Sequence, residues 1–87
     1  MKPMNYAILE LFESGDTYDA EAVMAQLNDQ YASFRMFKKA NVIESLMSAE
    51  KNDLLEQSHY ELDDAGDLHI YYKATEYGKD MIKRYIS

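Results

Sequence analysis

Residues 58–72 read SHYELDDAGDLHIYY, and this stretch decides the expected fold. Two runs that alternate in polarity, 58–62 and 68–72, flank a short acidic segment that contains Gly66. Such alternation, rich in aromatic and branched residues, is typical of β-strands. A three-residue loop over 64–66 places the glycine where a type I turn followed by a bulge needs a positive φ. The stretch therefore predicts a β-hairpin.

The same alternation predicts which residues face one another across the hairpin. The expected inner-face pairs are Leu62 with Leu68, Tyr60 with Ile70, and Ser58 with Tyr72. The outer face then carries His59, Glu61 and His69, a nominal trio of metal ligands. Their spacing matches no strong zinc motif, and exposed polar residues on a solvent-facing strand explain them more simply. No metal site is expected.

Three helices are expected before the hairpin and one after it, because apolar residues recur at steps of three and four. The expected helices cover about 4–13, 20–28, 34–50 and 76–86. Asp19, Ser33 and Thr75 are the expected N-caps of the last three. The expected buried face of the third helix consists of Phe37, Ala40, Ile43, Leu46 and Met47.

This order of three helices, a hairpin and a final helix resembles that of winged helix-turn-helix domains. Residues 42–55, VIESLMSAEKNDLL, look like the end of a recognition helix that runs into the first wing strand. Residues 71–79, YYKATEYGK, are similar to the strand-to-helix junction of small bacterial regulators of the MarR-like and PadR-like kind. The expected fold class is α+β and mainly helical, with one winged helix-turn-helix domain over residues 1–87.

Length and composition exclude several classes of protein. The chain has 87 residues and no cysteine, so one domain without disulfides or thiolate metal sites is expected. It has no phosphate-binding glycine loop and no nucleophile elbow, so neither an enzyme nor a cofactor or small-molecule substrate is expected. No apolar stretch approaches the ~18–20 residues of a membrane span, and the N-terminus has no apolar signal core. A cytoplasmic protein without membrane contact is therefore expected.

The charge distribution carries the functional prediction. The net charge is −7, yet residues 35–39, RMFKK, hold three bases and no acid. By position, the resemblance implies that the third helix enters the major groove of duplex DNA. Its DNA-binding residues would be Arg35, Lys38, Lys39, Asn41 and Ser45. Arginine and lysine suit guanine edges or phosphates, asparagine suits adenine, and serine suits either. Bases at a helix N-terminus also oppose the macrodipole, which favours a functional reason over a merely solvated helix face.

A second interpretation stays open. Asp63, Asp64 and Asp67 place three negative charges at the hairpin tip that should approach DNA phosphates, and this opposes binding. Eight tyrosines and six methionines would also suit a protein contact surface. The alternative is a winged-helix module for protein–protein interaction or dimerisation that does not bind DNA. In either case a homodimer is expected, because a core this small is marginal alone and a dimer presents two recognition helices to a two-fold site.

Overall fold

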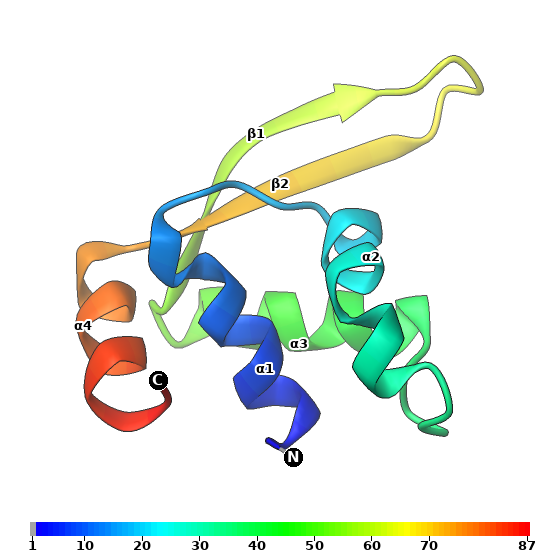
Figure 1. The fold of residues 1–87 in the computed structure, drawn as a ribbon. Coiled ribbons are helices and arrows are strands. Elements are labelled where there is room, and N and C mark those ends of the chain that lie inside the picture. The colour runs from blue at the N-terminus through cyan, green and yellow to red at the C-terminus, as the bar shows by residue number, and fades with distance from the viewer. Residues whose placement is uncertain (1) are drawn as a thin grey trace.

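The structure, a computed structural model, describes residues 2–87 and confirms the predicted order of elements (Figure 1). The elements are α1 (Met4–Leu11) with the 3-10 turn η1 (Phe12–Ser14), α2 (Ala20–Tyr31), α3 (Lys39–Lys51), β1 (Leu55–Leu62), β2 (Leu68–Ala74) and α4 (Glu76–Tyr85). Within residues 2–87, none of the helices has both the length and the hydropathy to cross a membrane.

The core lies between the first three helices, and the base of the hairpin and α4 close it. Its largest fully buried side chains are Ile8, Phe12, Val23, Tyr31, Val42, Leu46, Leu55 and Ile82. Burying an aliphatic side chain of this size contributes about 1.5–3 kcal/mol. The core therefore draws on every helix and on β1, and it fixes the orientation of α3.

Asp19 caps α2 as predicted, because its Oδ1 accepts a hydrogen bond from the Ala22 N–H at 2.8 Å. Just before it, Tyr18 forms a backbone bridge with Tyr72 of β2, with N···O distances of 3.1 and 2.9 Å in the two directions. This bridge attaches the segment between α1 and α2 to the hairpin, as Figure 1 shows.

The hairpin has the predicted loop and, over its outer half, the predicted register. Leu62 pairs with Leu68 and Tyr60 with Ile70, while Gly66 has a φ of 85°. The expected pairing of Ser58 with Tyr72 is wrong. A bulge between Gln57 and His59 leaves Ser58 without a partner in β2, and Gln57 pairs with Tyr72. A bulge increases the local twist of a strand. Here it separates the base of β1, which reaches the core, from the outer half of the hairpin.

Thr75 caps α4, also as predicted. Its Oγ1 accepts a hydrogen bond from the Gly78 N–H at 2.8 Å and donates one to the Asp53 carbonyl at 2.6 Å. Gly78 lies so close to the turn before β1 that a Cβ atom there would come within 1.9 Å of the Leu54 carbonyl oxygen. The small residue therefore lets α4 pack against the backbone between α3 and β1.

Candidate nucleic-acid interface

The third helix begins at Lys39, five residues later than the sequence predicts. Residues 32–38 form turns instead, and Ser33 is not an N-cap. The reason is aromatic packing at the end of α2. The Tyr31 ring contacts Phe34 edge-on, with centroids 4.9 Å apart, and lies 6.5 Å from Phe37. With these contacts the chain forms turns up to Lys38, and the helix starts at Lys39.

Of the three predicted bases, only Lys39 is therefore inside the helix. Arg35 lies in the turn, and Lys38 is the N-cap residue with extended backbone angles. No side chain caps α3, whereas Asp19 caps α2 and Thr75 caps α4. The exposed cations thus gather at the start of α3, but only Lys38 and Lys39 lie where a positive charge opposes the macrodipole of α3.

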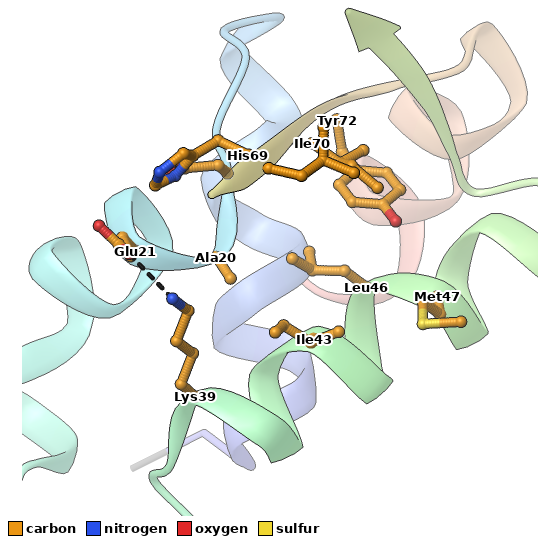
Figure 2. A pocket seen from close by; sticks show the side chains of 11 residues that line it. Ala20, Glu21, Lys39, Ile43, Leu46, Met47, His69, Ile70 and Tyr72 are labelled. Carbon is orange, nitrogen blue, oxygen red and sulfur yellow. Dashed lines mark hydrogen bonds and ion pairs between the residues drawn. The ribbon is translucent and has the colours of Figure 1, made fainter. Parts of the chain in front are cut away.

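The three bases differ in their partners. The Lys39 ammonium lies 2.9 Å from the Glu21 carboxylate at the start of α2, as the dashed line in Figure 2 shows. This hydrogen bond and ion pair raise the pKa of Lys39. Arg35 and Lys38 have exposed side chains that form no ion pair or side-chain hydrogen bond within residues 2–87. Arg35 and Lys38 are thus exposed, unpaired cations at the start of α3, and Lys39 adds little net charge.

Asn41 and Ser45 lie on the flank of α3 that faces α1. The Asn41 side-chain amide donates a hydrogen bond to the Met36 carbonyl at 3.0 Å. The Ser45 hydroxyl donates one to Oδ1 of Asn5 in α1 at 2.7 Å. Both side chains are half-buried, so the structure uses them to hold the basic turn and α1 against α3.

The residues of α3 that face outward differ from those expected from the sequence. Val42, Leu46 and Ala49 are buried, whereas the expected core residues Ala40, Ile43 and Met47 are exposed. The outward ridge consists of Ala40, Glu44, Met47, Ser48 and Lys51. The sequence pattern does not single out this ridge, because α3 carries two apolar stripes at helical spacing. The i, i+4, i+7 spacing of Val42, Leu46 and Ala49 was the signal that could have found it.

At the hairpin, His69 joins two acidic residues. Its Nδ1 lies 2.8 Å from Asp19, and its Nε2 lies 2.9 Å from Asp63 at the start of the hairpin loop. Hydrogen bonds to Asp63 and then to Asp19 raise the pKa of His69, and the bond from His69 lowers the pKa of Asp63. The second oxygen of Asp63 accepts from the N–H groups of Ala65 and Asp67, at 3.0 and 2.9 Å. The position of Asp63 is thus explained by its hydrogen bonds within the loop and by its partner His69.

The nominal trio of His59, Glu61 and His69 does not converge. His59 stacks on Tyr71, with ring centroids 4.6 Å apart, and its Nε2 lies 3.3 Å from Glu61. His69 instead turns to Asp19. Ligand atoms of Asp19, Glu21 and His69 lie within 4.8 Å of one another. Glu21 already pairs with Lys39, however, and both ring nitrogens of His69 already have carboxylate partners.

The sequence matches no protein-family model and shows no significant match to a curated protein. Solved structures do match. A PadR-like transcriptional regulator from Bacillus cereus superposes with a TM-score of 0.69 at 18% identity, over 92% of this chain and 74% of the other. PadR of Bacillus subtilis in complex with operator DNA gives 0.74 at 16% identity, over 92% and 44%. A PadR family regulator from Clostridium difficile gives 0.71 at 20%, over 92% and 79%.

The fold is a winged helix. In this winged helix, α2 and α3 with the turn between them form the helix-turn-helix, and β1 with β2 forms the wing (Figure 1). The fold class expected from sequence is confirmed, as is the resemblance to PadR-like regulators in fold.

Proposed function

We propose that this chain is a cytoplasmic, DNA-binding transcription regulator in which the N-terminal end of α3 approaches the duplex. The fold is shared with PadR-like regulators, one of which was solved with operator DNA, and this supports the general class. The observation that carries the proposal is the placement of Arg35 and Lys38. Both are exposed at the entry to α3, and neither has an acidic partner within the described chain.

In this proposal Arg35 and Lys38 bind phosphates. Phosphate contacts position a protein on the duplex and supply much of its affinity. The first-turn N–H groups of α3, which no side chain caps, add donors that suit the same anionic groups. Lys39 contributes only where a phosphate displaces Glu21 from it. Asn41 and Ser45 keep the turn and α1 in place beside this end of the helix.

Base contacts would come from the outward ridge of α3. Ser48 and Lys51 can donate hydrogen bonds to base edges, and Glu44 can accept one from the amino group of cytosine. Ala40 and Met47 can contact thymine methyl groups. The ridge has no arginine and one acid, so sequence discrimination would rest on few strong contacts.

The wing contributes repulsion rather than affinity. Asp63 is paired with His69, but Asp64 and Asp67 form no ion pair within residues 2–87. We therefore infer that the wing tip stays away from the phosphate backbone and that α3 dominates the contact. DNA binding should then be weak, and it should depend strongly on salt.

The experiment is a fluorescence-anisotropy titration of a labelled, mixed-sequence duplex over a series of salt concentrations. We compare R35Q/K38Q with K83Q/R84Q, which removes the same charge from α4 at the other end of the molecule (Figure 1). R35Q/K38Q should bind more weakly. The slope of the logarithm of its binding constant against the logarithm of the salt concentration should be flatter by about 1.8, because each lost phosphate contact contributes about 0.9. The α4 variant should keep the slope. Equal losses in the two variants, or no binding by the unaltered chain at low salt, would contradict the proposal.

We also propose that the chain is a homodimer. Tyr6 of α1 and both Tyr77 and Tyr85 of α4 are exposed. Exposed aromatic side chains suit a protein interface. Two copies joined through this surface would present two α3 helices to a two-fold site.

A further inference from the structure

The wing and α3 enclose an apolar groove. Ile43, Leu46 and Met47 line it from α3, and Leu68, Ile70 and Tyr72 line it from β2 (Figure 2). It encloses about 120 Å³. Leu46 and Tyr72 are buried and form the floor, whereas Met47 is 57% and Leu68 56% exposed and form the edges.

The apolar surface continues along the wing. Leu62 pairs with Leu68 and Tyr60 with Ile70, and residues opposite one another in an antiparallel pair point to the same face. Tyr60 is 69% exposed and Leu62 is 65% exposed. The sequence pattern predicts this face as the inner one, but beyond Ile70 no part of the described chain covers it. Scattered apolar residues are normal on a surface, whereas a contiguous patch with a polar rim is typical of a protein contact site.

The charged residues that line the groove pair among themselves, Asp19 with His69 and Glu21 with Lys39. The unpaired charges beside it, on α3 and at the wing tip, form a rim that is mostly acidic. Glu44 and Glu50 of α3 line a shallow hollow together with Ile43 and Met47, and neither acid forms an ion pair within residues 2–87. Asp64 and Asp67 at the wing tip are likewise without an ion-pair partner in the described chain. Among the nearby bases, Lys39 is paired with Glu21, which leaves Lys51 at the end of α3 to offset one of these four charges.

We propose that this groove binds a cationic amphipathic helix of a partner protein. Apolar side chains at positions i, i+3 and i+7 of such a helix would fill the groove between α3 and the wing. Lysine or arginine on its flanks would face Glu44 and Glu50 on one side and Asp64 and Asp67 on the other. The acidic rim distinguishes this occupant from DNA, since phosphates are repelled where cations are attracted. A bound helix would also block the approach of a duplex to the groove side of α3.

The test uses a labelled synthetic helix of leucine and lysine, with a leucine and glutamate helix of the same apolar pattern as the ligand control. The cationic helix should bind and the anionic one should not. M47S/L68S removes the exposed edges of the groove and should weaken binding about tenfold. Y77S/Y85S removes two side chains from α4 that are 56% and 73% exposed, and it should leave binding unchanged.

A second pair of variants tests the rim without altering the apolar groove. E44K/D64K reverses two exposed charges that form no side-chain hydrogen bond in the described chain, and it should weaken binding of the cationic helix. Equal binding of both peptides, or equal losses in M47S/L68S and Y77S/Y85S, would overturn the proposal. Loss of self-association in M47S/L68S by sedimentation equilibrium would overturn it too, because the occupant would then be a second copy. Neither readout involves DNA, so failure here is separate from failure of the proposed regulator function.

Discussion

The Nδ1 atom of His69 lies 2.8 Å from a carboxylate oxygen of Asp19, a residue fifty positions earlier in the chain. Asp19 caps α2 with its other oxygen, and the second ring nitrogen of His69 contacts Asp63 in the wing. When His69 is protonated, both ring N–H groups donate to carboxylates. One imidazolium thus joins the start of α2 to the wing loop, and it sets where the wing lies relative to α3.

This relationship predicts a pH dependence of stability. The pKa of His69 is raised above 6.5 by its bonds to Asp63 and Asp19, so its contribution is complete below about pH 6.5 and is lost as the pH rises through the higher folded pKa. The pKa of Asp63 is lowered below 3.8, so its contribution is present above that pH and is lost as the pH falls through the lower folded pKa. Glu21 and Lys39 lie beside His69 and form their own pair.

We therefore expect the urea midpoint of the unaltered chain to fall between pH 6 and pH 9, while that of H69Q stays nearly level over the same range. H59Q is the matched control on the same hairpin and should retain the fall, because His59 contacts Tyr71 and Glu61 rather than α2. If the urea midpoint of H69Q fell with pH as steeply as that of the unaltered chain, His69 would not be the source of the pH dependence.

The two roles of Asp19 can be separated by substitution. D19N keeps an oxygen for the Ala22 N–H but loses the negative charge that faces His69. D19A loses both contacts. We expect D19A to unfold with a free energy about 1 kcal/mol lower than that of D19N, since asparagine is a good N-cap and alanine is not. Both variants should lose part of the pH dependence above pH 6, because Asp63, the larger cause of the raised pKa of His69, remains in place. The measurement is urea unfolding followed by circular dichroism, and equal stabilities would argue against the cap.

Gly78 should not tolerate a side chain. G78A places a Cβ atom 1.9 Å from the Leu54 carbonyl oxygen, so α4 must move away from the turn before β1. We expect a loss of about 3 kcal/mol or more in the free energy of unfolding. G66A is the control, because a Cβ there meets nothing within 4 Å and only the φ of 85° is unfavourable. Its loss should be about 1–2 kcal/mol. Similar losses in the two variants would contradict the close approach of α4.

The proposed dimer predicts a solution mass of two chains by light scattering coupled to size-exclusion chromatography. Y77S/Y85S should shift that mass to one chain that keeps its circular dichroism spectrum, because both side chains are exposed in the single chain. M47S/L68S should leave the mass unchanged. A single-chain mass for the unaltered protein at high concentration would exclude the dimer.

Local sequence signals predict much of the fold. Gly66 and the alternation around it specify the wing loop and its outer register, and Asp19 and Thr75 cap their helices as expected. The bulge at Ser58 was not predictable from alternation. The base of the hairpin must bury Leu55 and bridge Tyr18 to Tyr72, and both requirements come from other parts of the chain.

The candidate site is less predictable, because its decisive contacts are distant in sequence. Arg35 and Lys38 are exposed, as a basic run in an acidic chain suggests. The partner of Lys39 lies eighteen positions away, and the partner of Ser45 lies forty positions away. The start of α3 depends on Phe34 packing against Tyr31. The sequence does not reveal this contact, because Ser33 followed by apolar residues at helical spacing resembles an N-cap and a helix.

The most direct measurement of the central claim is an amide chemical-shift titration of the chain with a short mixed-sequence duplex at low salt. We expect the largest shift changes at residues 35–41 and along the outward ridge of α3, with α4 unchanged. The changes should fade as salt is added, because phosphate contacts carry the binding. Absence of any change, or changes confined to α4 or to the tip of the wing, would contradict binding of DNA through the N-terminal end of α3.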